Sequence, residues 1–479
     1  MKIVFFDLAN INYSTATVYQ SPLGGSQSAI SYLAMHLANL GHDIFLVNKI
    51  SAPTITHGVA CLPINSVTND FWQSIDFIIC FNGADHGDAL RKICGTKVNI
   101  ILWNQHAHDQ PAIQNLINQK ERESYDSFFM ISDWQARNFI NTFNLKAEKI
   151  HILRNAVGPS FDNLLDGKSP ILEKKSRPIC LAYTSAPYRG LKLLLKIFPK
   201  IRERFPNVTL KVFSSMQVYR ISEEQEKEYF GEEFYRMREM YETLKEMDGV
   251  DYIGSIPQSD LAKELEKVSI LAYPNTFPET SCIAVMEAMA SGCHIITSDL
   301  GALPETTAGF ATLVPFNQDL EVYQQNFVTA TIDHINYLQL ANANDIEKEL
   351  NKQIAYCQQN YLWKERAQEW LKKLYEIRGY TFFKHQEYKI AIDIYQEALE
   401  NFPDSENFCC YLIICLILFG LEDEALSFIM NAVINSNLSS LNYLPQKLNE
   451  VLEKESNFLM NANEGNALKV IANFFNQLD

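Results

Sequence analysis

The sequence has little positive charge: 41 lysines and arginines stand against 57 aspartates and glutamates, which gives a formal net charge of −16. So acidic a surface disfavours broad binding to nucleic acids or to anionic membranes. Its ten cysteines form no CxxC pair and lie mostly in apolar patterns, so we expect buried free thiols rather than disulfides or a metal site. The longest apolar run, residues 408–419, is shorter than the roughly 20 residues that cross a bilayer.

A chain of 479 residues is too long for one hydrophobic core, since such cores stop growing at about 250–300 residues. Short apolar, β-branched runs alternate with helical patterns through its first part. These runs begin at Lys2, Asp43, Phe77, Val98, Ser127 and Lys149, and residues 26–40 have apolar side chains at helical spacing. Continuous apolar strands separated by helices predict a parallel sheet that is buried on both faces.

The alternation is interrupted at residues 159–177, which are rich in Asp, Gly, Lys and Pro and therefore predict a linker. A second series of runs begins at Pro178, Asn207, Val250, Val268, Cys293 and Ala311, with a charged helical insertion at 223–248. We therefore predict an α/β fold with two Rossmann-like, doubly wound domains. Because ligands of such sheets bind beyond the carboxyl ends of the strands, two of these edges could face each other across a cleft.

After about residue 379 only helical patterns remain, and the chain matches itself with a period of 34 residues, Ala391 with Ala425 and Ala398 with Ala432. This period is typical of tetratricopeptide repeats. The first unit fits at Gly379, Phe382, Ala391, Tyr395, Ala398 and Pro403, whereas the second is degenerate. We expect an all-α helical-repeat module whose first helix continues from the preceding one; a plain helical hairpin with accidental alanines is the alternative.

The strongest signal for chemistry is the segment FPETSCIAVMEAMASG, residues 277–292. Glu279 follows a strand-like run, and Glu287 lies eight positions further along, a little over two turns into the expected helix. Thr280 and Ser281 are good N-cap residues, so free backbone N–H groups should gather at a helix N-terminus that suits a diphosphate. The carboxylate of Glu287 could accept two hydrogen bonds from vicinal ribose hydroxyls. Alternatively, two glutamates at this spacing are a solvated helix face.

This segment resembles the signature of retaining GT-B glycosyltransferases of family 4, which are related to glycogen and sucrose synthases. That signature is Glu, seven residues, Glu, then Ala-Met-Ala-x-Gly. It is matched here by Glu279, Glu287, Ala288, Met289, Ala290 and Gly292, and the following loop agrees at Gly301, Leu303, Pro304 and Glu305. The resemblance implies that Glu279 contacts the transferred sugar and that Glu287 contacts the ribose of the nucleotide. Thr280, Ser281 and Cys282 are further candidates for donor binding.

Two other segments fit the same resemblance, which covers about residues 1–378. Gly24 and Gly25 precede the first helix, as in the family's N-terminal glycine loop, although a simple tight turn explains them as well. Arg189 stands where the family has a lysine and could neutralise the leaving diphosphate. The family's second basic residue, about five positions earlier, is replaced by Thr184 and Ser185.

A histidine completes the candidate catalytic group of Glu279, His106 and Arg189. His106 follows a strand-like run, where the family places a histidine near the reacting sugar carbon. His106 and His108 could instead be a metal pair, but no third ligand stands near them at ligand spacing. The sequence also has no Asp-x-Asp, the usual device for a metal–diphosphate. We therefore expect no metal and no cofactor other than the nucleotide-sugar itself.

These patterns predict an N-terminal acceptor-side domain at 1–160, a nucleotide-sugar-binding domain at 176–362, a crossing helix at 363–378 and a tetratricopeptide-like module at 379–479. The resemblance implies a hexosyltransferase that uses a UDP- or GDP-sugar and a glycan, glycolipid or protein acceptor. The repeats predict a protein partner or a homo-oligomer, and nothing predicts nucleic-acid binding. We expect a cytoplasmic protein, which could also lie peripherally at the inner membrane face. The alternative function is a non-catalytic nucleotide-sugar-binding scaffold that uses its repeats for partners.

Overall fold

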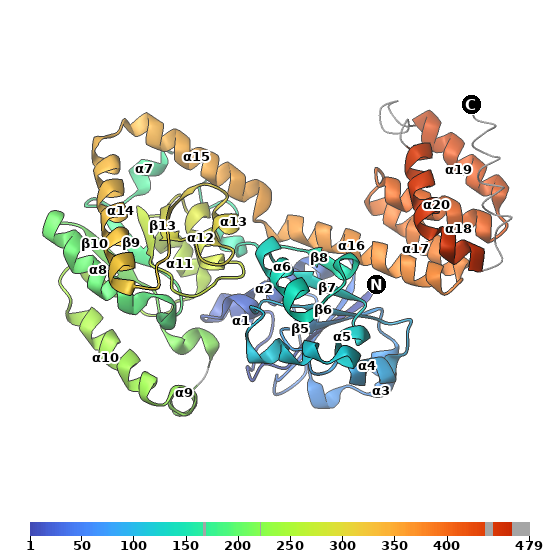
Figure 1. Ribbon diagram of the computed structural model, residues 1–479, viewed down its shortest axis with the longest axis horizontal. Coiled ribbons are helices and arrows are strands. Elements are labelled where there is room, and N and C mark those ends of the chain that lie inside the picture. Colours follow the sequence, from blue (N-terminus) through green and yellow to red (C-terminus); the bar gives the residue numbers. More distant parts are fainter. Residues whose placement is uncertain (166–168, 221, 436–443, 462–479) are drawn as a thin grey trace. The chain divides into compact units, whose positions relative to one another are not determined.

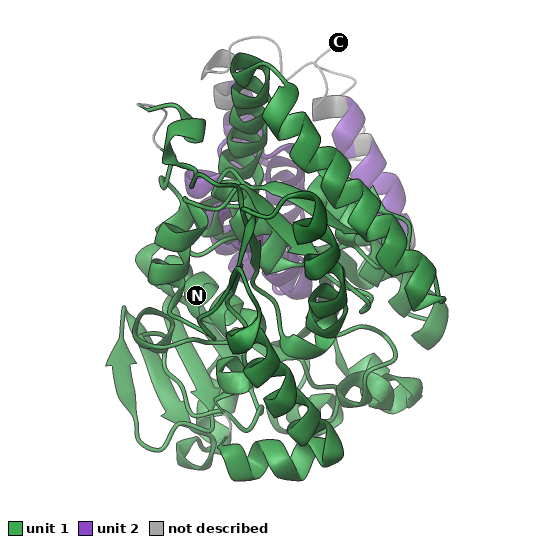
Figure 2. Ribbon diagram, turned by 90° about the vertical axis from the view of Figure 1, so that its left-hand side faces the viewer, with its two compact units in different colours: residues 1–367 green, residues 368–479 purple. Residues whose placement is uncertain are grey.

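The structure is a computed structural model that describes residues 1–165, 169–220, 222–435 and 444–461. Its chain divides into two compact units, residues 1–367 and residues 368–479 (Figures 1 and 2). The division falls inside helix α16 (Trp363–Lys384). This helix runs without a break through residue 379, which confirms the expected continuation into the helical module.

The first unit begins with an eight-stranded sheet of order β3-β4-β2-β1-β5-β6-β7-β8. Its six predicted strands are confirmed and pair in parallel: β1 (Lys2–Asp7), β2 (Asp43–Asn48), β5 (Phe77–Phe81), β6 (Asn99–Trp103), β7 (Ser127–Met130) and β8 (Ile150–Ile152). Two further strands were not predicted: β3 (Thr54–Thr56), which pairs antiparallel, and β4 (Val59–Pro63). The helices are α1 (Thr17–Gln20), α2 (Gly25–Asn39), α3 (Asn69–Gln73), α4 (Gly87–Cys94), α5 (Gln119–Ser124) and α6 (Asp133–Phe143).

A second sheet follows in the same unit, with the order β11-β10-β9-β12-β13-β14 and every pair parallel. All six predicted strands are confirmed: β9 (Cys180–Tyr183), β10 (Thr209–Val212), β11 (Val250–Tyr252), β12 (Ile270–Tyr273), β13 (His294–Ser298) and β14 (Ala311–Val314). The charged insertion forms two helices, α9 (Glu223–Phe230) and α10 (Glu232–Glu246). The other helices are α7 (Ile171–Lys174), α8 (Leu191–Arg204), α11 (Gln258–Leu265), α12 (Ile283–Ala290), α13 (Leu303–Thr307), α14 (Leu320–Leu340) and α15 (Ala343–Asn360).

Burial on both faces explains why the strands read as continuous apolar runs. All five residues of β5 are buried, as are all four of β12. Helices α2 and α8 each bury apolar side chains, among them Leu33 and Ile197. Since burying one such side chain contributes about 1.5–3 kcal/mol, these two cores fix the sheet edges that carry the polar loops described below.

The second unit is helical, with α17 (Tyr388–Asn401), α18 (Glu406–Leu418), α19 (Glu422–Asn435) and α20 (Leu444–Asn461) after α16. Helix α18, which holds the longest apolar run, packs against α17, α19 and α20. Gly379 lies against Tyr395, because a Cβ at this glycine would come 2.5 Å from the tyrosine ring. This small–aromatic pair fits the expected repeat, while the tetratricopeptide assignment stays a prediction. The side chain of Ala432, used in the repeat match, lies outside the described residues.

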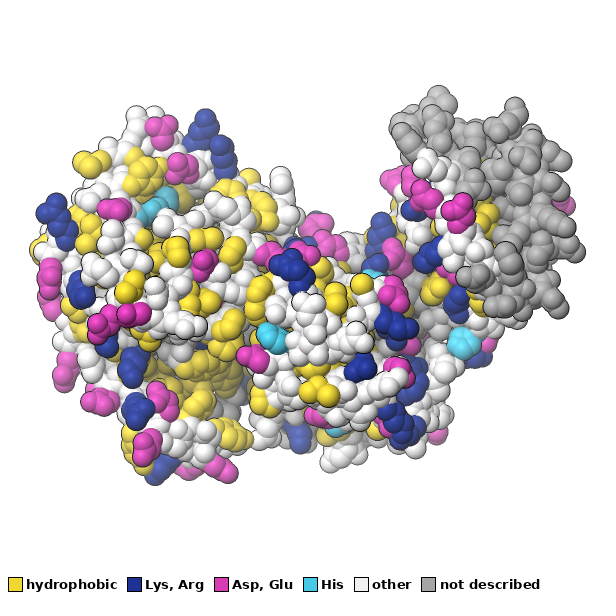
Figure 3. Space-filling view, viewed as in Figure 1, with side chains coloured by type: hydrophobic (Ala, Val, Ile, Leu, Met, Phe, Trp, Pro, Cys, Tyr) yellow, Lys and Arg dark blue, Asp and Glu magenta, His cyan; other side chains and the backbone are white. Residues whose placement is uncertain are grey.

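The surface has charges of both signs, and Figure 3 shows lysine and arginine side chains interspersed with acidic ones over the face in view. In the described part of the chain, no helix is long and apolar enough to span a bilayer. The same residues contain no group of three or more His, Cys, Asp or Glu side chains that could hold a metal ion.

Candidate active site

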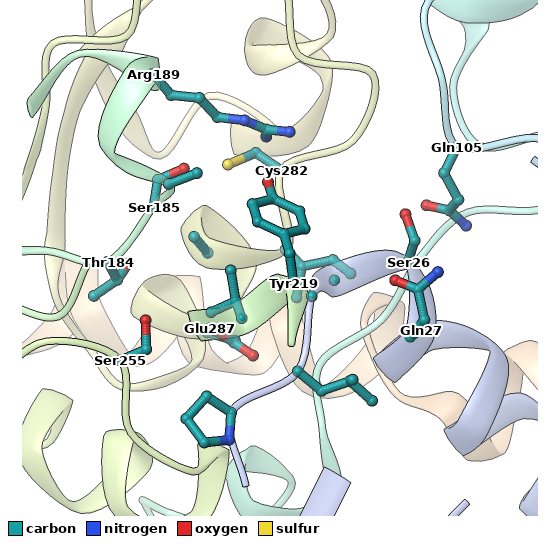
Figure 4. Close-up of a pocket in the computed structure, with 18 of the residues that line it drawn as sticks. Ser26, Gln27, Gln105, Thr184, Ser185, Arg189, Tyr219, Ser255, Cys282 and Glu287 are labelled. Carbon is teal, nitrogen blue, oxygen red and sulfur yellow. The ribbon is translucent and has the colours of Figure 1, made fainter. Parts of the chain in front are cut away.

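A cleft of about 430 Å³ lies within the first unit, where loops after the strands of both sheets meet. Figure 4 shows Thr184, Ser185 and Arg189 on one side and Ser26, Gln27 and Gln105 on the other. Every candidate site residue from the sequence lines this cleft: Glu279, His106, Arg189, Glu287, Thr280, Ser281, Cys282, Gly24 and Gly25. The structure therefore brings together candidates from segments as far apart in the sequence as Gly24 and Glu287, while their individual roles stay predictions.

Glu279 is buried and fully engaged at the end of the loop after β12. Both of its carboxylate oxygens accept hydrogen bonds from Nη1 of Arg189 at 2.8 Å, and Oε1 also accepts from the Tyr273 hydroxyl at 2.5 Å. Gly301 makes this loop possible: its φ is +63°, and a Cβ there would lie 2.3 Å from the Glu279 carbonyl oxygen. The carboxylate is therefore held in one place before any ligand enters.

Arg189 reaches Glu279 from the segment that precedes α8. Its guanidinium lies 4.8 Å from the centre of the Phe277 ring. Burial alone would lower the pKa of Arg189, but the Glu279 charge beside it raises that pKa well above its usual value. The next residue, Gly190, has φ +134° and passes so close to β12 that a Cβ would lie 2.2 Å from the Pro274 carbonyl oxygen. This close approach fixes where Arg189 stands.

Helix α12 begins later than the sequence suggested. Its N-cap is Cys282, without a side-chain cap, so the expectation that Thr280 and Ser281 cap this helix is wrong. Thr280 instead donates its hydroxyl hydrogen bond to the Gln105 carbonyl at 2.8 Å, on the other side of the cleft. The later start also places Glu287 in the second turn of α12 rather than beyond it. The N-cap and the first two residues of this eight-residue helix, Cys282, Ile283 and Ala284, all line the cleft.

Glu287 differs from Glu279 in its electrostatics. Burial raises its pKa from 4.5 to about 8, and a hydrogen bond from Gln258 lowers it in part. That bond joins Nε2 of Gln258 to Oε1 of Glu287 at 2.5 Å. No cation pairs with the Glu287 carboxylate within the described residues. The carboxylate thus has spare capacity to accept hydrogen bonds.

The N-terminal side of the cleft is built from α2 and the loop after β6. Gly25 is the first residue of α2, and a Cβ there would lie 3.3 Å from Ile283 across the cleft. His106 lines the cleft, whereas His108 contacts Trp134 at a ring distance of 6.2 Å. Burial lowers the pKa of His106, a hydrogen bond with Gln110 raises it in part, and the charge of Arg189 lowers it, so the net shift favours the neutral ring. A neutral ring can accept as well as donate a hydrogen bond.

Several lining residues were not among the site residues predicted from the sequence, although Thr184 and Ser185 had been noted in place of the family's second basic residue. These lining residues are Gln27, Gln105, Asn155, Thr184, Ser185, Tyr219 and Gln258. Gln105 and Asn155 hydrogen-bond each other twice, at 2.7 and 3.1 Å. The hydroxyl of Thr184 is buried and has no partner among the described residues. A polar residue two positions after a strand was the available signal for Gln105, but nothing in one sequence separates such a residue from an ordinary loop position.

Contacts between the two Rossmann-like domains surround the cleft. Glu305, which the resemblance had marked, accepts hydrogen bonds from the backbone N–H groups of Asp133 and Trp134 at 2.8 and 3.2 Å, and it also pairs with Arg154. The acidic side chain therefore caps the N-terminus of α6, where the helix dipole favours a negative charge. A second contact between the two Rossmann-like domains is the hydrogen bond that Arg220 donates to the Ser21 hydroxyl at 2.6 Å.

Comparison with known proteins agrees with this geometry. Residues 168–323 match the family model "Glycosyl transferases group 1". A curated relative, one of the subunits of phosphatidylinositol N-acetylglucosaminyltransferase in Arabidopsis thaliana, is 22% identical over 192 residues. That match covers 40% of this chain and 38% of the relative, so the chain spans well under half the length of the relative.

Solved structures resemble the first unit over most of their length. A glycosyltransferase from Rickettsia africae has a TM-score of 0.58 at 14% identity, with 78% of this chain and 98% of that chain covered. Anabaena HepE in complex with UDP and glucose has a TM-score of 0.55 at 14% identity, covering 78% and 99%. The fold is GT-B. An α,α-trehalose-phosphate synthase from Burkholderia vietnamiensis agrees, with a TM-score of 0.56 at 11% identity and coverage of 79% and 97%. Within this GT-B fold, the matched family segment contains Arg189, Glu279 and Glu287.

Proposed function

We propose that this protein transfers a sugar from a nucleotide-sugar donor to an acceptor hydroxyl, with retention of the anomeric configuration. The observation that carries the proposal is the wall of the cleft formed by Glu279, the N-terminus of α12 and Glu287. It offers a fixed carboxylate at one end, backbone N–H groups in the middle and a second carboxylate with free acceptor capacity at the other. Sugar, diphosphate and ribose follow one another in the same order in a nucleotide-sugar.

The match to group 1 glycosyltransferases supports this assignment, because it spans the residues of that wall. The solved complex of Anabaena HepE holds UDP and glucose, which favours a UDP-sugar as the first donor to test. For this chain the donor is a UDP- or GDP-sugar, and the acceptor is a glycan, glycolipid or protein.

In the proposed reaction the bond between the anomeric carbon and the phosphate oxygen breaks, and the nucleoside diphosphate leaves with the electron pair. The acceptor oxygen forms its bond to the same face of the sugar, and its proton passes to a phosphate oxygen. Arg189 and the N–H groups of α12 stabilise the charge that develops on the diphosphate. Thr184 supplies a hydroxyl at the position where the resembled family has a cation. Glu279 and neutral His106 hold sugar hydroxyls.

Donor hydrolysis by the purified protein tests the proposal. A panel of UDP- and GDP-sugars should include one that wild-type protein cleaves slowly without acceptor, and Glu279→Gln should cleave it at least a hundredfold more slowly. Proton NMR of the first product should show the configuration of the donor. If members of the panel bind but none is cleaved, the non-catalytic nucleotide-sugar-binding scaffold replaces the enzyme; if none binds, both functions fail.

A further inference from the structure

A chain of two hydrogen bonds connects the N-terminal domain to Glu287. Tyr32, a buried residue of α2, donates its hydroxyl hydrogen to Oε1 of Gln258, the first residue of α11. Nε2 of Gln258 then donates to Oε1 of Glu287 at 2.5 Å. The same helix α2 carries Gly25 at its N-terminus, in the wall of the cleft.

The chemistry of these groups fixes the direction of both bonds. Above its pKa of about 8 the Glu287 carboxyl is ionised and only accepts hydrogen bonds, so the Gln258 amide must then turn its nitrogen toward Glu287. Its oxygen then points to Tyr32, whose hydroxyl has to donate. A reversed amide would place its oxygen against the carboxylate. The Tyr32 hydroxyl therefore satisfies the amide oxygen in the orientation that serves Glu287.

We propose that Gln258 is a positioning residue that aims the Glu287 carboxylate at the ribose of the nucleotide, and that Tyr32 makes this aim depend on contact between the two Rossmann-like domains. The proposal rests on the proposed function, since it concerns the same nucleotide site. Gln258 occupies Oε1 of Glu287, and among the described residues no side chain hydrogen-bonds Oε2. Oε2 is thus the oxygen left for a ribose hydroxyl, and the amide sets the plane in which it lies.

We call the three hydrogen-bonded side chains of Tyr32, Gln258 and Glu287 the relay. Little free space remains beside its first hydrogen bond. Gly158 lies beside it, because a Cβ at that position would come 2.9 Å from the Tyr32 hydroxyl and 3.0 Å from Oε1 of Gln258. A side chain at residue 158 would therefore have to displace the two groups that form the first hydrogen bond of the relay.

The hydroxyl of Tyr32 and the thiol of Cys282 do not compete with the Gln258 amide for the orientation of Glu287, because they carry no charge at pH 7. Burial, Tyr19, Glu287 and Asp162 all raise the pKa of the Tyr32 hydroxyl. Burial and the neighbouring carboxylates, Glu287 among them, raise the pKa of the Cys282 thiol. Neither Tyr32 nor Cys282 is therefore charged at pH 7. Asp162, whose pKa burial raises to about 6, acts on the tyrosine end of the relay.

The relay links ribose binding to domain contact by thermodynamic reciprocity. When α2 and α11 separate, the amide loses its hydroxyl donor and can rotate, and Glu287 loses its fixed orientation. A ribose that binds the aimed carboxylate therefore favours the state in which the domains touch. When any member of the relay is changed, the protein should therefore lose affinity for a nucleotide that has ribose hydroxyls but not for one that lacks them.

Isothermal titration with UDP, GDP and the 2′,3′-dideoxy analogue of whichever binds wild-type protein more tightly tests the proposal. We expect Tyr32→Phe to weaken the ribonucleotide about threefold to tenfold, since one hydrogen bond is removed, and Gln258→Leu to weaken it at least as much. Both should leave the dideoxy analogue unchanged. Gly158→Ala should act like Tyr32→Phe without removing a polar group, because its methyl group displaces the far ends of two side chains.

Tyr125→Phe is the matched control, since that buried tyrosine in the N-terminal domain donates to Glu121 at 2.7 Å, away from the cleft. It should change neither affinity. A second readout is pH: affinity for the ribonucleotide should fall as pH drops below the pKa of Glu287, and Gln258→Leu should move this fall to higher pH.

Two results would overturn the relay while leaving the proposed function intact. One is an equal loss of affinity for ribonucleotide and dideoxy analogue in Tyr32→Phe and Gln258→Leu. The other is an unchanged ribonucleotide affinity in those variants when Glu287→Ala does weaken it. If wild-type protein binds neither UDP nor GDP, the proposed function fails and the relay with it.

Discussion

Replacing Glu287 by glutamine should stabilise the free protein, and chiefly at high pH. In the folded protein, burial raises the pKa of Glu287 from 4.5 to about 8. A group whose folded pKa is raised contributes stability below its unfolded pKa and loses it as pH rises through the folded value. Since one pKa unit is worth about 1.4 kcal/mol, ionised Glu287 costs roughly 4 to 5 kcal/mol above pH 8. Glutamine keeps an acceptor for Gln258 and avoids this cost.

Thermal unfolding of wild type and Glu287→Gln from pH 5 to pH 9 measures the effect. The Tm of the variant should exceed that of wild type by roughly 5 °C at pH 9, because the unfolding entropy of a chain of this length is about 1 kcal/mol/K. Most of this difference should disappear toward pH 5, where the folded protein keeps Glu287 protonated. Glu279→Gln is the control: Glu279 is paired with Arg189 and Tyr273, so this variant should be destabilised. A Tm difference for Glu287→Gln that does not change with pH would refute the reasoning.

Three further predictions concern activity. Glu279→Ala should abolish transfer, because its proposed contact lies at the reacting sugar, while Glu287→Ala should mainly raise the donor KM. Equal, near-wild-type kinetics in both variants would contradict the assignment. Transfer should survive EDTA, which initial rates with and without the chelator will show; a loss of activity that Mn²⁺ restores would contradict metal independence. Arg189→Ala should raise the donor KM or lower kcat. Deleting residues 379–479 should leave donor hydrolysis measurable while reducing transfer to the natural acceptor or changing the mass in solution. A truncated protein with full transfer and unchanged mass would remove both roles from the helical module.

Much of the fold could be predicted from the sequence, because the strands of a buried parallel sheet have a recognisable apolar pattern. Every strand that reads as a buried apolar run, such as β5 and β12, was predicted, since burial on both faces requires such a run. β3 and β4 were not predicted, because they are not buried on both faces and therefore lack such an apolar run. β3 is a three-residue edge strand whose Ile55 is 77% exposed, and β4 alternates buried with half-buried residues. β3 lies at the edge of the sheet and β4 next to it, where burial is incomplete, so their sequences carry a weaker apolar pattern.

The site was predictable where one segment supplies several groups. Glu279 and Glu287 were found because a short motif holds both. Gln258 was not, because its importance comes from Tyr32, 226 positions away. The capping error at Thr280 has a similar origin: a threonine before a helix is a good local cap, but here Gln105 from the other domain offers its carbonyl. Local rules fail where a residue from the other domain competes for the same hydroxyl.

The pairing of Arg189 with Glu279 bears on how a diphosphate could enter this cleft at all. Among the described residues that line it, Arg189 is the one with a permanent positive charge, and in the free protein a buried carboxylate already neutralises it. A donor must therefore rely on the N–H groups of α12 and the Thr184 hydroxyl, or draw Arg189 away from Glu279. In the second case the carboxylate keeps its bond to Tyr273 and gains free lone pairs, which the sugar hydroxyls can fill. Phosphate and sugar would then bind cooperatively through one ion pair, and truncated ligands should show it: UDP and the free sugar together should bind more tightly than the product of their separate affinities.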